Sequence, residues 1–269
     1  MQLLPGQFGK LGKLPPKADL RALRFENYFR SAVPQPVPPT RYNWSTLVGK
    51  TWPMFTNDRL STCTLSAASD LILDWTTNQS TPDIVSDNDI IGAYSVVSGY
   101  DPSDGSGDNG ASMVDVMNWW RAAGIGRHKI GAWVRLALNN NIQFKNALWL
   151  LGGIYVGLGL PVSAQAQTGL NKIWDVVPGG AVGYASPYSW GGHAVAVVSY
   201  DATGLLCATW GFQQFMTWNF LNTYCDECYG VLSPDWLPVS TNFSRKRTRP
   251  IEKYLDVERL RFDTARLEL

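Results

Sequence analysis

This 269-residue chain has two histidines and four cysteines, so any mechanism that pairs a thiol with an imidazole must choose among these six residues. A thiolate attacks a carbonyl carbon, and an imidazole takes and returns the proton. His128 stands between Arg127 and Lys129, whose charges disfavour an imidazolium, so we expect it in a solvated surface loop. His193 follows two glycines and opens an apolar strand, which would hold the ring rigidly while the glycines let another group approach. His193 is therefore the better candidate base.

Among the thiols, Cys63 has the sequence context that best suits a nucleophile. The apolar residues after it recur at helical spacing: Leu65, Ala68, Leu71, Ile72 and Trp75. Cys63 therefore stands at the start of a predicted helix, where a nearby imidazolium and the helix N-terminus lower a thiol pKa and favour thiolate at neutral pH. Cys207 lies in a strand-like run and is expected to be buried. From these residues alone, a structural thiol and a structural histidine remain the alternative.

Two further groupings of ligand-type residues do not predict a metal site. Cys225 and Cys228 form a C-x-x-C, but a structural zinc needs four ligands and no second pair follows at suitable spacing, so we interpret them as structural thiols. Asp101, Asp104 and Asp108 lie in a glycine-rich loop that lacks the closing glutamate of an EF-hand. We expect a plain surface loop there, and no metal or cofactor.

Composition excludes several classes of partner. The formal net charge is +1, so no overall field favours nucleic acid or an anionic membrane, and we interpret the basic run 245–249 as a solvated segment. The most apolar run, 147–162, is shorter than the roughly 20 residues that span a bilayer, and we expect a buried helix followed by a buried strand. Residues 1–14 lack an apolar core and a cleavage site, so we expect no classical secretion signal and a cytoplasmic or particle-assembled protein.

The order of predicted elements indicates an α+β protein. A proline-rich N-terminal arm, residues 1–41, carries one short helical stretch within 19–30. A helix-rich stretch of 42–138, with an amphipathic helix around 113–120, precedes a strand-rich stretch of 139–238. The expected strands are Ile154–Leu160, Ala194–Tyr200 and Leu205–Trp210. Residues 42–238 are thus expected to form one two-lobed body, and 239–269 a basic and charged tail or docking helix.

Four segments, in order, resemble blocks of the papain family of cysteine peptidases. They are Asn57-Asp-Arg-Leu-Ser-Thr-Cys63-Thr-Leu-Ser-Ala, Gly107-Asp-Asn109-Gly110-Ala, Gly192-His193-Ala-Val-Ala-Val-Val-Ser-Tyr200 and Thr209-Trp210-Gly211. The family counterparts are Gln-Gly-Ser-Cys-Gly-Ser-Cys-Trp-Ala-Phe-Ser, Gly-Cys-Asn-Gly-Gly, the strand carrying the base, and Asn-Ser-Trp-Gly. Cys63 and His193 are 130 residues apart, within the roughly 130–150 typical of the family. The resemblance spans residues 42–236.

The resemblance implies a two-lobed papain-like fold, with a helical left lobe and an antiparallel, barrel-like right lobe. It implies that Cys63 attacks a peptide or isopeptide carbonyl to give a thioester while His193 moves the proton. The Cys63 N–H and the Asn57 side chain, which stands where the family has glutamine, would hold the oxyanion.

The same resemblance places the substrate. The backbones of Asn109 and Gly110 would line the cleft, Gly192 would lie beside the base, and Trp210 would shield the His193 ring. A peptide or protein is the implied substrate.

The chain departs from the family pattern at two places. The cysteines of a family disulfide are replaced by Leu60 and Asp108, which agrees with folding in a reducing compartment. The asparagine that orients the imidazole aligns with Ala208 when counted from Trp210, and with Thr209 when counted from His193. Thr209 is then the candidate orienting residue, with a hydroxyl in place of an amide.

Three functions are compatible with these residues. A cysteine-type peptidase is favoured, because both Cys63 and His193 stand at matching positions. The alternative is a papain-fold protein with little or no catalysis, for example a component of a viral particle or other assembly, with the arm and tail as protein contacts. A transglutaminase-like enzyme would need an acidic third member, for which Asp201 is the nearby candidate.

Overall fold

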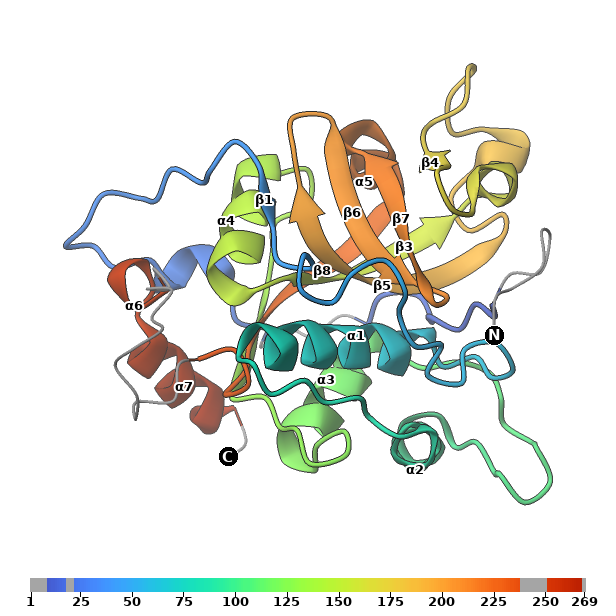
Figure 1. Ribbon diagram of the computed structural model, residues 1–269, viewed down its shortest axis with the longest axis horizontal. Helices are drawn as coiled ribbons and strands as arrows, with labels where there is room; N and C mark the ends of the chain where they lie inside the picture. Colours follow the sequence, from blue (N-terminus) through green and yellow to red (C-terminus); the bar gives the residue numbers. More distant parts are fainter. Residues whose placement is uncertain (1–8, 18–21, 238–250, 268–269) are drawn as a thin grey trace.

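A mostly antiparallel sheet forms the centre of the computed structural model, which describes residues 9–17, 22–237 and 251–267 (Figure 1). Its strand order is β2-β8-β3-β5-β6-β7-β4, with β1 added beside β5, and only the β4–β7 pair is parallel. The strands are β1 Tyr42–Asn43, β2 Ala132–Arg135, β3 Ile154–Leu160, β4 Ile173–Trp174, β5 Gly191–Tyr200, β6 Gly204–Thr209, β7 Phe212–Thr217 and β8 Cys225–Leu232.

Several α-helices, although not α1, begin after a residue whose side chain accepts from their first free N–H groups. Ser86, Ser112 and Asn140 cap α2, α3 and α4 in this way, and Gly99 and Gly152 end α2 and α4 in the left-handed conformation. The α-helices are α1 Cys63–Asn78, α2 Asp87–Ser98, α3 Met113–Ala122, α4 Asn141–Leu151, α5 Trp218–Tyr224, α6 Ile251–Tyr254 and α7 Val257–Arg266, and the 3-10 helices are η1 Phe25–Tyr28, η2 Val162–Gln167 and η3 Gly183–Ala185.

Helix α1 is the element that joins the two halves of the molecule. It runs beneath the sheet, with α2 and α3 on its other side, and it contacts β5, β6 and β3 (Figure 1). Trp75 of α1 stacks on Trp120 of α3, with ring centroids 5.7 Å apart. Nearly every α1 side chain is buried, because the helix has protein on both faces. The first residue of this rigid helix is Cys63.

The C-terminal helices pack on the base of the arm. Asp256 donates its backbone N–H to Tyr28 O at 2.8 Å, and the Tyr28 hydroxyl donates to Asp263 Oδ2 at 3.0 Å. The Arg259 guanidinium lies over the Tyr28 ring, 5.6 Å from its centroid. Residues 25–28, which form η1 within the arm, are therefore held by α7 and the residue before it.

The α+β fold class is confirmed, as are the helix that follows Cys63 and the amphipathic helix that becomes α3. The apolar run 147–162 contains the end of α4 and all of β3, as expected. The helical stretch expected within 19–30 is reduced to η1, and residues 18–21 and the basic run 245–249 lie outside the described residues. Within the described ranges, no helix has the length and apolar character needed to cross a membrane.

Candidate active site

Cys63 and His193 come from α1 and β5, a helix and a strand that pack against each other. Cys63 begins α1 and His193 is the third residue of β5, and each is only 1% exposed. The Cys63 sulfur lies against the backbone N–H of Ala194, the residue that follows the histidine. The helix start and the strand therefore bring the candidate nucleophile and the candidate base to one buried place.

The His193 ring is held on one edge and one face. Its Nε2 lies 2.7 Å from Thr209 Oγ1, and the ring stacks on Trp210 with centroids 4.2 Å apart. Ala208 is paired with Ala196 inside the sheet, so of the two residues considered for the orienting role, Thr209 is the one at the ring. Nδ1 has no hydrogen-bond partner among the described residues. The threonine fixes Nε2, and Nδ1 is left for proton transfer.

The arm's tip lies across this site. In the arm segment 9–14, the N–H groups of Gly12 and Lys13 donate to Gly192 O at 3.2 and 3.1 Å. The Leu14 N–H donates to Ala111 O at 3.1 Å, and Ala111 returns its own N–H to Gly12 O at 2.8 Å. The arm therefore pairs with both walls, the glycine loop before α3 and the start of β5.

Glycines on these walls make the close approach possible. A β-carbon at Gly192 would lie 2.0 Å from Lys13 O, and one at Gly110 would lie 2.0 Å from Gly12 O. Gly12 is equally constrained, because its β-carbon would lie 2.0 Å from Ser61 O. Gly110 and Gly192, which the sequence assigned to the cleft, therefore lie where the arm of the same chain passes. Asn109, the residue before Gly110, is exposed.

Asn57 points its side-chain amide at the arm. Its Nδ2 donates to Lys10 O at 3.0 Å and to Leu60 O at 3.1 Å, and Trp210 Nε1 donates to the same Lys10 oxygen at 3.3 Å. The sulfur of Cys63 instead lies against the amides of Gly12 and Lys13. The thiol and the Asn57 amide thus contact different residues of the arm.

Asp108 links the glycine loop to the nucleophile segment. Its Oδ1 accepts from the Ser61 N–H and the Tyr94 hydroxyl, both at 2.8 Å, and its Oδ2 lies 3.0 Å from Lys10 Nζ. Burial raises the pKa of this carboxyl, but the Ser61 amide, Tyr94 and Lys10 outweigh it and hold the pKa below its ordinary value. A carboxylate thus makes a polar link between the two segments that a disulfide joins in the family.

The thiol and the imidazole are both held neutral in this arrangement. Burial raises the pKa of Cys63 to about 11, although the amides of Ala194, Gly12 and Lys13 and the Lys13 charge lower it. Burial alone lowers the pKa of His193 to about 3. The expectation of a thiolate at neutral pH is therefore wrong for this closed arrangement, because burial outweighs the helix N-terminus.

No protein-family model and no curated protein matches this sequence. Among solved structures, xylellain, a cysteine protease from Xylella fastidiosa, matches with a TM-score of 0.60 and 14% identity over 86% of this chain and 99% of its own. Procathepsin B S9 from Trypanosoma congolense matches with a TM-score of 0.54 and 11% identity over 85% of this chain and 87% of its own. This chain has a papain-like fold.

A third match has the same fold within a larger protein. The cysteine protease and lectin-like domains of Cwp84 from Clostridium difficile give a TM-score of 0.57 and 12% identity over 85% of this chain. The present chain spans 57% of that chain's length. Within this fold, Cys63 begins helix α1 and His193 lies in strand β5 of the sheet.

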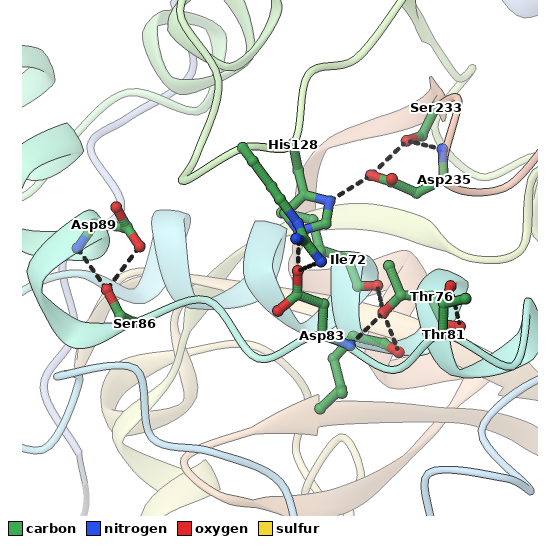
Figure 2. A network of polar contacts seen from close by, with 11 residues as sticks. Ile72, Thr76, Thr81, Asp83, Ser86, Asp89, His128, Ser233 and Asp235 are labelled. Atoms are coloured by element: carbon green, nitrogen blue, oxygen red, sulfur yellow. Dashed lines mark hydrogen bonds and ion pairs between the residues drawn. The ribbon is translucent and has the colours of Figure 1, made fainter.

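His128 is not the solvated residue that its neighbours predicted. The side chain is 6% exposed, with Nε2 2.9 Å from Asp83 Oδ2 and Nδ1 2.9 Å from Asp235 Oδ2 (Figure 2). Burial lowers the pKa of the ring, but the two carboxylates outweigh it and raise the pKa. Arg127 is exposed, and its guanidinium lies 2.6 Å from the same Asp83 Oδ2, so this carboxylate faces both basic side chains. His128 fastens the α1–α2 connection to the end of the papain-like body.

Sequence reasoning missed a buried charge cluster at the cleft. Lys13 of the arm is fully buried and pairs with Asp226 and Glu227, at the start of β8. The signal available was weak, because a lysine in a proline-rich arm and an acidic pair inside a C-x-x-C are both typical of solvated surfaces. Within the described part of the chain, no group of residues has the arrangement of a metal site.

Proposed function

We propose that this chain is a papain-like thiol hydrolase, a cysteine peptidase that cleaves peptide or isopeptide bonds through a thioester on Cys63. One observation carries the proposal. His193 is fixed at Nε2 by Thr209 and on its face by Trp210, so that Nδ1 is the nitrogen left to exchange a proton. A base held by a third residue beside a thiol is the arrangement of nucleophilic catalysis.

The chemistry follows from these positions. His193 Nδ1 takes the proton from Cys63 Sγ, and the thiolate attacks the substrate carbonyl carbon. The oxyanion accepts from the Asn57 amide and from the Cys63 N–H, which lies at a helix start where N–H groups lack intrahelical partners. His193 then gives its proton to the leaving amine, and water attacks the thioester under the same base to release the acid and the free thiol.

The proposed reaction requires the arm to move. With the arm segment 9–14 in place, a substrate cannot pair with Gly192 and Ala111, whose backbone groups already bind Gly12 and Leu14. Displacement of the arm would also hydrate Cys63 and His193, remove the burial that holds both neutral, and permit a thiolate–imidazolium pair. The described arrangement is therefore the closed form of the proposed enzyme.

The test is the rate of Cys63 alkylation by iodoacetamide from pH 4 to 9, read as mass added to the intact chain. Gly12→Ala, which forces the arm from Ser61, is compared with the same variant carrying His193→Ala and with denatured chain. We expect Gly12→Ala to react well below the ordinary thiol pKa of about 8.5, and the double variant to lose that reactivity. An unperturbed thiol titration in Gly12→Ala would refute the enzyme and leave a papain-fold binding protein, such as an assembly component.

A further inference from the structure

The Lys13 side chain is buried among side chains of the body of the molecule, and we call the site that it fills the pocket. It is fully buried, and its Nζ lies 3.0 Å from Asp226 Oδ2 and 3.0 Å from Glu227 Oε1. Nζ also donates to the Tyr188 hydroxyl at 3.1 Å and to its neighbour's carbonyl, Leu14 O, at 3.0 Å. The ammonium thus has four oxygen contacts, two of them carboxylates.

The pocket is built by the body and not by the arm. The Tyr229 hydroxyl donates to Glu227 Oε2 at 2.8 Å, and the Tyr188 hydroxyl bonds to Asp226. Glu227 is 1% exposed, and its Oε1 pairs with the Lys13 ammonium at 3.0 Å and has no other partner among the described residues. Asp226 Oδ1 is also buried without a hydrogen-bond partner in the described chain. The two tyrosines therefore hold the carboxylates in place, and Glu227 Oε1 is left to pair with the cation that occupies the pocket.

Glycines of β3 leave the room that the cation uses. A β-carbon at Gly157 would lie 2.5 Å from Lys13 Cε and 2.7 Å from Glu227 Cγ. A β-carbon at Gly159 would lie 2.6 Å from the ring of Tyr188. Glycine in the interior of a buried strand marks a site where another group approaches closely. Here the approaching groups are the lysine stem and the tyrosine that closes the pocket.

The pocket adjoins the candidate nucleophile. The backbone amide of the same Lys13 lies against the Cys63 sulfur, and Lys13 forms a bridge with Ala111 on the cleft wall. Any chain that pairs with Ala111 in the arm's place would direct a side chain to the same cavity. Glu227 is buried and Asp226 is 21% exposed, so the pair of carboxylates is costly without a cation, and such a chain is selected by its charge.

We propose that the pocket of Asp226, Glu227, Tyr188 and Tyr229 binds a lysine side chain of the substrate close to the scissile bond, and that Lys13 occupies it in the closed form. This inference rests on the proposed peptidase function. A substrate with an uncharged side chain of equal length would leave both carboxylates unpaired, and a site built around polar contacts rejects such an analogue strongly.

The test uses the full chain with Lys13→Met, which removes the arm's cation and keeps a similar stem. Two tripeptidyl fluoromethyl ketones are compared, identical except for lysine or norleucine, placed in turn at the two positions before the reactive residue. The readout is the rate at which Cys63 gains mass. We expect the lysine probe to react about 100-fold faster, and the further change Glu227→Gln to reduce or reverse that preference. Equal rates in Lys13→Met would overturn the lysine pocket while leaving the peptidase intact.

A second measurement separates the pocket from the chemistry. Thermal unfolding of Lys13→Met is followed with n-butylammonium chloride, with n-butanol and sodium chloride as controls. We expect the ammonium alone to raise the midpoint, by about 3 °C, and Glu227→Gln to abolish the shift. No shift would overturn the pocket. A shift without labelling by either probe would leave a lysine-binding site and refute the peptidase.

Discussion

Acidification from pH 7 to pH 4 is expected to open the cleft through His193. In the closed form, burial holds the pKa of the ring at about 3, whereas a hydrated imidazole titrates near 6.5. Because the closed-form pKa is the lower one, the open form binds more protons between these values. The stability of the closed form is therefore present above about pH 6.5 and is lost as the pH falls towards 3.

The two pKa values set the size of the effect. At pH 4 the hydrated ring is almost fully protonated and the buried ring almost fully neutral. The change from pH 7 to pH 4 therefore favours the open form by roughly 200-fold, or about 3 kcal/mol. Asp108, whose pKa is lowered in the closed form, loses its contribution in the same direction as the pH falls. Acid should thus release an arm that is held firmly at neutral pH.

Amide hydrogen exchange of Gly12, Lys13 and Leu14 reports this opening, because these N–H groups bond to the cleft walls. Protection factors, corrected for the intrinsic effect of pH, should fall by about two orders of magnitude at pH 4, while the amides of α1 stay protected. His193→Phe keeps a ring against Trp210 and should show a much smaller fall. Equal protection of the arm at both pH values, or the same fall in the phenylalanine variant, would refute this reasoning.

Three further outcomes are expected. Thr209→Val leaves His193 Nε2 buried without its partner, so the free energy of unfolding, measured by urea titration, should fall by about 1–3 kcal/mol. Nitrogen NMR should show a single imidazole tautomer of His193 in the native chain and a mixture of tautomers in the variant. Gly12→Ala should raise the alkylation rate of Cys63 at pH 7 by about tenfold or more without a change in the far-UV circular dichroism; an unchanged rate would show that the arm does not protect the thiol. His128→Gln should destabilise the chain by about 2 kcal/mol at pH 6. The loss should be smaller at higher pH, because the native ring loses its proton as the pH rises through its raised pKa. Urea titrations at pH 6 and 9 measure both values; a constant difference would show that the native imidazolium is not the stabilising form.

The elements that carry Cys63 and His193 could be predicted because their signals are local. Apolar residues at helical spacing placed the start of α1 near the thiol, and a β-rich apolar run placed β5 at the imidazole. The pairing of the two elements has no local signal. It came from the order and spacing of weak motifs, and the fold of the matched structures agrees with it.

The electrostatics of the site could not be predicted, because they depend on a distant segment. Nothing near Lys10 or Lys13 in the sequence shows that the first meets Asp108 and that the second is buried with Glu227. The same limit applies to His128, whose acceptors Asp83 and Asp235 are 45 and 107 positions away. A sequence neighbour gives the sign of a local charge, whereas the fold decides which charges a buried ring meets.

Because α7 anchors Tyr28 to the body, the arm is equivalent to a ligand that is tethered beside its own binding site. Since residues 25–28 are fixed on the body, the tip is confined near Gly192 whatever the protein concentration. A short tether of this kind corresponds to a millimolar effective concentration. Weak backbone contacts are then enough to keep the cleft filled, and a free peptide of residues 9–14 should compete poorly with the tethered copy. Leu23 and Arg24 also pair with Arg135 of β2, so the anchored segment 23–28, held by β2 and α7, acts on how strongly the N-terminal segment blocks the cleft without touching the site.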